Sequence, residues 1–82
     1  MVMAFYIELK KFEENEQTVC YSYCGTGDDR WGKVRISKSS DEFDILQYAS
    51  GDQHGSHAKR ALMKLVKLRK SGEFPDITSW AS

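Results

Sequence analysis

The chain has 82 residues, and its 12 basic and 12 acidic residues leave no net formal charge. A chain of this length buries a small core, so we expect one domain over residues 1–82, and the 40% hydrophobic content excludes a disordered protein. No apolar run approaches the roughly 20 residues that a membrane helix needs, and we recognise no export signal, so we expect a cytoplasmic protein without membrane association.

Three segments predict the first strands of an antiparallel sheet. In residues 4–12, Ile7 and Leu9 point to one face and charged residues to the other, which is the period of a half-buried strand. Residues 17–24 are rich in β-branched and aromatic residues, and their pattern leaves open which face is buried. Residues 33–38 alternate again and predict a third strand.

The segment 42–48 allows two interpretations. Phe43, Leu46 and Ala49 recur at helical spacing, and the serines before them could cap a helix. The segment is short, however, and turn-forming residues separate it from a clear strand, which favours a fourth strand. We therefore expect a meander of three or four strands, with the nature of 42–48 left open.

Residues 57–71 have the strongest pattern in the chain and predict an amphipathic helix. Ser56 is placed to cap its N-terminus, and Gly72 is placed to cap its C-terminus. Arg69 falls inside the apolar arc, so either the helix leaves the core there or a carboxylate such as Asp76 meets it. The apolar residues of the arc are Ala58, Ala61, Leu62, Leu65, Val66 and Leu68.

The tail after this helix carries Phe74, Ile77 and Trp80, and we expect it to dock on the core. A helix packed on a sheet in two layers buries the apolar face of each. The predicted fold class is therefore α+β: an antiparallel sheet of three or four strands packed against one long C-terminal helix, with a docked C-terminal tail.

The candidate metal ligands and catalytic groups are Cys20, Cys24, His54 and His57. On one strand the two thiols would lie about 13 Å apart, too far for a disulfide or a shared zinc ion. The two histidines are spaced more closely than zinc-finger histidines. A hydrolase could use either histidine as a general base, but no nucleophile motif accompanies them. We therefore predict no catalytic residue, no metal site, no cofactor and no enzymatic activity.

Charge is distributed unevenly along the chain. Residues 1–55 hold ten carboxylates against six cations, whereas residues 56–72 hold six cations and no carboxylate. The carboxylates cluster in predicted turns, where they would attract a basic protein. An Arg-Trp pair in an exposed loop is favoured at binding hot spots, but Trp31 could equally fold into the core. The residues predicted to bind such a partner are Glu14, Glu16, Asp28, Asp29, Arg30, Trp31, Asp41 and Asp44.

The cations of the helix support two further interpretations. The plainer one is a solvated helix face. The other is an RNA- or DNA-binding surface made by Arg60, Lys64, Lys67 and Lys70, although nucleic-acid-binding domains are usually basic as a whole. Met63 projects among these cations, and an exposed methionine indicates an interface.

Two segments carry a family resemblance. FYIELKK near the start and AKRALMKLVKLRKSGEFPDITSWAS at the end resemble small bacterial immunity proteins, which are found beside secreted or contact-delivered toxins. The resemblance implies a cytoplasmic, non-enzymatic protein that binds one toxin domain, and it assigns no site residue. We therefore predict a protein-binding module that neutralises a toxin effector with a basic binding surface. A small nucleic-acid-binding domain is the alternative, and the oligomeric state stays open.

Overall fold

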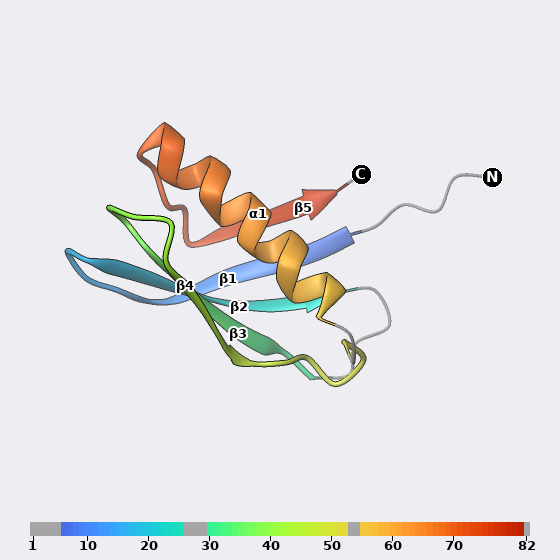
Figure 1. Cartoon of the computed structure of the whole chain (residues 1–82). Coiled ribbons are helices and arrows are strands. Elements are labelled where there is room, and N and C mark those ends of the chain that lie inside the picture. The colour runs from blue at the N-terminus through green and yellow to red at the C-terminus, as the bar shows by residue number, and fades with distance from the viewer. Residues whose placement is uncertain (1–5, 26–29, 53–54, 82) are drawn as a thin grey trace.

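The computed structural model describes residues 6–25, 30–52 and 55–81. These residues form a five-stranded antiparallel sheet with one helix packed on one of its faces (Figure 1). The strands lie in the order β4-β3-β2-β1-β5. The elements are β1 (Tyr6–Glu14), β2 (Thr18–Gly25), β3 (Gly32–Ser37), β4 (Phe43–Gln47), α1 (Ser56–Ser71) and β5 (Ile77–Ala81).

The α+β class and the meander of the first four strands are confirmed, and the open segment 42–48 contains strand β4. The expectation of three or four strands is wrong, because the tail forms a fifth strand. β5 pairs antiparallel with β1, with Trp80 opposite Ile7 and Ile77 opposite Lys10. The tail does dock, since Phe74 and Trp80 pack against the core, but its last residues form a sheet strand and Ile77 stays exposed.

Side-chain and backbone contacts anchor the segment that leads into β5. The Tyr21 hydroxyl donates a hydrogen bond to the Pro75 carbonyl, and burial raises the pKa of this hydroxyl to about 12. The Lys11 N–H donates to the Asp76 carbonyl at 2.7 Å, and the Lys11 ammonium donates to the Phe74 carbonyl at 2.9 Å. These contacts hold residues 74–76 against β1 and β2 just before β5 begins.

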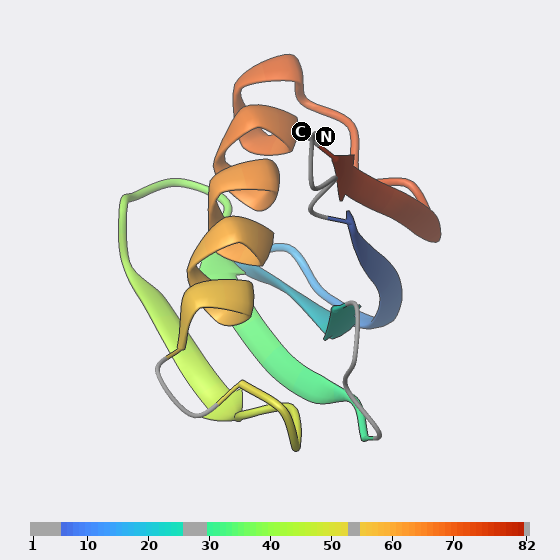
Figure 2. The same ribbon diagram turned by 90° about the vertical axis from the view of Figure 1, so that its right-hand side faces the viewer.

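The helix-facing side of the sheet carries the core, and Figure 2 shows α1 lying across that side. On β2, the inner face is the one with Val19, Tyr21 and Tyr23, which answers the question that the sequence left open. The opposite face carries Cys20 and Cys24. The buried core consists of Ile7, Leu9, Val19, Tyr21, Tyr23, Val34, Ile36, Ala49, Ala58, Ala61, Leu62 and Leu65.

The start of α1 is fixed by Asp52, whose side chain is buried with only 2% of its surface exposed. Its carboxylate accepts hydrogen bonds from the N–H groups of His57 and Ala58, each at 2.9 Å. The Tyr23 hydroxyl donates to the same carboxylate at 2.9 Å and accepts from the Ala49 N–H at 3.0 Å. One carboxylate thus joins the helix, β2 and the segment after β4.

The expectation that Ser56 caps the helix is wrong. Ser56 is the first helical residue, and Gly55 occupies the cap position with a φ of 73° and no side-chain cap. Because Asp52 reaches the free N–H groups from outside the helix, a side-chain cap at position 55 is unnecessary. At the other end, Gly72 adopts a φ of 83° and its N–H donates to the carbonyls of Leu68 and Arg69, as its position predicts.

Within the described ranges, no helix combines the length and hydrophobicity that a membrane crossing requires.

We predict that replacing Asp52 with Asn lowers the free energy of unfolding by about 2–3 kcal/mol, because the charged acceptor of three hydrogen bonds is lost. Burial raises the pKa of the Asp52 carboxyl, but hydrogen bonds from His57, Ala58 and Tyr23 lower it more, and its net pKa lies below the ordinary 3.8. The carboxyl therefore contributes stability above about pH 4, and this contribution is lost as pH falls through the lower folded pKa.

Urea unfolding followed by circular dichroism at pH 7 measures the effect of Asp52→Asn. Glu16→Gln is the matched control, since it removes a carboxylate from an exposed turn and is expected to change stability by less than about 0.5 kcal/mol. Equal effects of the two substitutions would contradict the assigned role of Asp52.

We also predict that Gly32→Ala destabilises the protein by about 2 kcal/mol or more. An added Cβ would overlap the Tyr23 ring and would lie 2.7 Å from the backbone nitrogen of Ala49. The Tyr23 ring cannot move away without breaking its hydrogen bond to Asp52. Gly72→Ala is the comparison: open space surrounds its Cβ, so only the left-handed backbone costs about 1 kcal/mol. A Gly32→Ala protein as stable as the parent would refute this close approach.

Candidate protein-binding groove

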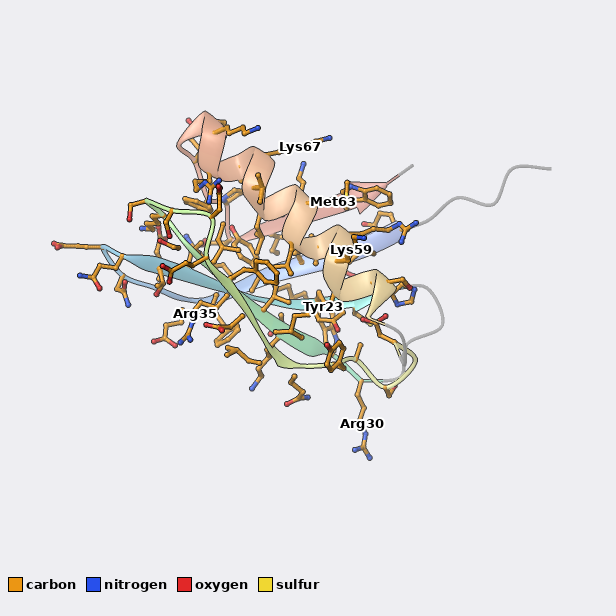
Figure 3. All side chains as sticks on the ribbon, in the orientation of Figure 1. Tyr23, Arg30, Arg35, Lys59, Met63 and Lys67 are labelled. Carbon is orange, nitrogen blue, oxygen red and sulfur yellow. The ribbon has the colours of Figure 1, made fainter. Side chains whose placement is uncertain are left out.

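An apolar groove of about 530 Å³ lies between α1 and the edge strand β4. Phe43 and Met63 contribute its most exposed apolar side chains, at 58% and 48% of their surface. Figure 3 shows Lys59, Met63 and Lys67 in succession along α1. The groove is lined by Asp41, Phe43, Lys59, Leu62, Met63, Val66, Lys67 and Lys70.

The apolar surface of α1 is wider than the part of it that packs in the core, and the remainder forms one wall of the groove. Leu62 is buried in the core and also lines the groove, whereas Met63, one residue later, is exposed. On β4, alternation places Phe43 and Ile45 on the helix-facing side, opposite Ile36 and Val34 of β3. Ile45 reaches the core, but Phe43 lies beyond it. Apolar side chains from both elements therefore remain uncovered.

The rim of the groove is positively charged. Lys59, Lys67 and Lys70 line it, and within the part of the chain that the structure describes they form no ion pair. Asp41 also lines the groove, but its carboxylate is paired with Arg69 at 2.6 Å. Three cations of the rim are therefore left without compensating charge.

Arg69 is the cation that fell inside the predicted apolar arc. Its guanidinium donates hydrogen bonds to the Ser40 carbonyl and to Asp41, both in the connection between β3 and β4. Asp76, which the sequence suggested as a partner, instead lies 3.3 Å from the ammonium of Lys11. The pair of Arg69 and Asp41 holds the end of α1 near the start of β4.

The backbone of β4 is open on the side away from β3. The Ser37 N–H donates to the Glu42 carbonyl at 3.0 Å, which makes this a hydrogen-bonded pair of the ladder. Because such pairs alternate with pairs whose polar groups point outward, Phe43 and Ile45 direct their N–H and C=O groups away from β3. No described strand pairs with β4 on that side.

The residues that the sequence predicts to bind a partner lie in two groups at opposite ends of the sheet (Figure 1). Glu14 and Glu16 lie at the β1–β2 turn, at the same end as Asp41 of the β3–β4 connection and Asp44 near the start of β4. Arg30 and Trp31 precede β3 at the other end, and Figure 3 shows Arg30 pointing away from the body of the protein. The predicted residues Asp28 and Asp29 lie outside the described residues.

Ion pairs within the protein compensate several of the predicted carboxylates. Glu14 lies 2.6 Å from the Lys11 ammonium and 2.7 Å from that of Lys38, and these hydrogen bonds lower its pKa to about 2. Asp44 pairs with Arg35 at 2.5 Å, and Asp41 pairs with Arg69 as described above. Glu16 forms no ion pair with a described residue. Much of the negative charge at this end of the sheet is therefore neutralised locally.

Trp31 lies on the face of the sheet opposite the helix, partly buried but outside the core. The Lys10 ammonium lies 4.9 Å from the centre of its ring. On the same face, Lys33 lies 5.5 Å from the centre of the Phe12 ring, and Phe12 is the extra residue of a β-bulge in β1. These contacts place Trp31 away from the groove.

Of the four cations proposed for nucleic-acid binding, two line the groove and two do not. Lys67 and Lys70 line the groove, and Lys64 does not. The guanidinium of Arg60 lies 5.5 Å from the ring centre of Trp80 on β5. The Arg60 side chain is therefore directed toward β5, whereas Lys67 and Lys70 line the groove.

Of the candidate metal ligands, the structure describes Cys20, Cys24 and His57. No group of three or more His, Cys, Asp or Glu side chains that could hold a metal ion occurs among the described residues. Cys20 is buried and Cys24 is partly buried on the outer face of the sheet. The ring of His57 packs against Gly25, and His54 lies outside the described residues.

The groove itself was not predicted from the sequence, although one signal pointed to it. Met63 among the helix cations indicated an interface, but Leu62 and Val66 were assigned wholly to the core, and Phe43 could not be placed while 42–48 was ambiguous. Lys59 was not among the predicted site residues.

No protein-family model matches the chain, and comparisons with curated proteins and with solved structures return no significant match.

We predict that the Glu14 carboxyl titrates near pH 2 in the folded protein, because hydrogen bonds from Lys11 and Lys38 stabilise its charged form. Since this pKa is lowered, the ion pairs contribute stability above the ordinary pKa of 4.5 and lose it as pH falls toward 2. NMR titration of the side-chain carboxyl carbon measures the pKa directly. In Lys11→Met it is expected to rise toward 4.5, and an unchanged value would contradict the assignment.

Proposed function

We propose that this protein is a non-enzymatic protein-binding module whose partner docks in the groove between α1 and β4. The single observation that supports this most strongly is a solvent-open apolar groove with an unpaired lysine rim. Adjoining apolar surface left exposed on a small soluble protein is typical of interaction sites. Covering Phe43 and Met63 with a partner would remove their exposed apolar surface from water, which favours binding.

A protein partner fits this groove better than a small-molecule ligand. Small-molecule sites combine an enclosed apolar wall with convergent polar groups that fix the orientation of the ligand. Here the groove is open to solvent, and its lining is mainly apolar, with the charged side chains of Asp41, Lys59, Lys67 and Lys70 as its polar groups. An apolar centre with a charged edge is the usual anatomy of a protein interface.

The more specific form of this proposal is an immunity protein that binds and neutralises a toxin effector domain. Its support is the resemblance of the first strand, the helix and the closing segment to that class. The prediction that the acidic turns bind a basic partner stays a prediction, and the internal ion pairs of Glu14, Asp41 and Asp44 weaken its physical basis. The lysines of the groove instead favour an acidic partner surface.

Nucleic-acid binding is the second candidate function, and the unpaired Lys59, Lys67 and Lys70 favour it. The apolar floor between them does not, because a phosphate backbone gains nothing from contact with Phe43 and Met63. The two candidates differ in their response to salt. Binding through several phosphate contacts falls steeply as salt rises, whereas binding through an apolar centre changes little.

We predict that Met63→Asp weakens binding of the partner about 10- to 100-fold, because a carboxylate in the centre of the groove opposes burial of apolar surface. The partner is first captured from the native host by crosslinking to the parent protein, and its affinity is then measured with purified components by calorimetry. Since the Met63 side chain is half exposed, the stability of the protein is expected to change little.

Glu16→Lys is the matched control for this experiment. It changes an exposed carboxylate of the predicted acidic surface and lies outside the groove. If the partner docks in the groove, Glu16→Lys keeps its affinity. Loss of binding with Glu16→Lys and full binding with Met63→Asp would transfer the site to the acidic turns. For the immunity form, the parent protein, but not Met63→Asp, is expected to restore growth to cells that express the captured partner.

A further inference from the structure

We infer that the segment of the partner that enters the groove is an extended acidic strand that pairs antiparallel with β4 as a sixth strand of the sheet. This inference rests on the proposed function and specifies the chemistry of the partner. It follows from three properties of the described residues: the open backbone of β4, the side of the sheet on which the groove lies, and the spacing of the lysines along α1.

The backbone of β4 supplies the hydrogen bonds for such a strand. Phe43 and Ile45 direct their N–H and C=O groups away from β3, so two residues of the edge are ready to pair. Addition of an extended segment to an open edge is a recurrent mode of peptide recognition, in which the backbone provides affinity and alternate side chains provide specificity. Antiparallel pairing continues the pattern of the sheet.

The pleat of the sheet decides where the side chains of the added strand would lie. Residues that form hydrogen-bonded pairs with Phe43 and Ile45 carry their side chains on the same face as those two residues. That face is the helix-facing side, where the groove lies. Every second side chain of the partner strand would therefore extend over the groove, and the others would point to the opposite face.

The spacing of the lysines matches the spacing of alternate residues in a strand. Figure 1 shows α1 and β4 running in similar directions, and Figure 2 shows them as neighbours inclined to each other. Lys59 and Lys67 are eight residues apart on the helix, or about 12 Å at 1.5 Å per residue. The first and fifth residues of a strand are about 13 Å apart. Met63 stands halfway between the lysines, opposite the third residue of the strand.

This spacing defines a recognition pattern for the partner segment. The first and fifth residues are acidic and pair with Lys59 and Lys67, and the third is apolar and packs on Met63 and Phe43. Lys70 extends the positive rim beyond Lys67. A second copy of this chain does not fit, because edge-to-edge pairing of β4 strands would bring the two unpaired lysine rims together.

The test uses the intact protein and synthetic peptides with the core Glu-Thr-Val-Thr-Glu, titrated by NMR. The acidic peptide is expected to bind about tenfold more tightly than the same peptide with Gln in place of Glu. Lys59→Glu combined with Lys67→Glu is expected to abolish this preference. Lys64→Glu is the matched control, because Lys64 belongs to the same helix but does not line the groove, and it should keep the preference.

Backbone methylation separates strand addition from other modes of binding. In antiparallel pairing, the amide of the valine points to β4, whereas the amides of the threonines point to solvent. Methylation of the valine nitrogen should weaken binding about tenfold or more, and methylation of a threonine nitrogen should not. Amide hydrogen exchange at Phe43 and Ile45 should slow when the peptide binds.

The outcomes distinguish this inference from the proposed function. If Met63→Asp weakens binding of the captured partner but the two methylated peptides bind with equal affinity, the partner docks in the groove without adding a strand. The inference is then overturned. If Met63→Asp leaves the partner unaffected, the proposed docking site fails. The peptide affinity could also disappear at moderate salt and not depend on the valine side chain. Binding would then be purely electrostatic, and the inference would be overturned.

Discussion

The buried carboxylate of Asp52 is the interaction on which the arrangement of the other elements depends. It receives two N–H groups from the first turn of α1 and the hydroxyl of Tyr23, and Tyr23 in turn receives the N–H of Ala49. A buried charge is tolerated only where hydrogen bonds replace its hydration, so the groups around it are held in one geometry. Because the helix and the end of the β4 segment meet at this point, Asp52 also sets how far α1 lies from β4.

The groove is a consequence of the relative sizes of the helix and the sheet. Five strands spaced about 4.8 Å apart make a sheet roughly 19 Å wide, whereas one helix with its side chains covers about 10–12 Å. The core accordingly centres on β1, β2 and β3, and the outer part of the helix-facing side at β4 stays uncovered. Arg69 and Asp41 join α1 to the β3–β4 connection at one end of this uncovered strip without filling it.

Elements whose signals are local could be predicted from the sequence, and elements that depend on distant partners could not. Alternation identified β1 and β3, β-branched and aromatic residues identified β2, and Gly72 marked the end of α1, because these signals are local to each element. β5 was missed as a strand because a short segment after Pro75 becomes one only by pairing with β1. The capping role of Asp52 was missed because it acts from outside the helix.

The predicted acidic site shows how charge along a sequence differs from charge in space. In a meander, successive turns lie at alternate ends of the sheet, so Glu16 and Trp31 could already have been separated by topology alone. Neighbouring strands and the helix also bring cations to Glu14, Asp41 and Asp44, which we predicted from the sequence to attract a basic partner. The helix cations behave in the opposite way. Lys59, Lys67 and Lys70 line the groove, where the described lining contains one carboxylate, the already paired Asp41. The proposal of an acidic partner rests on this uncompensated positive charge.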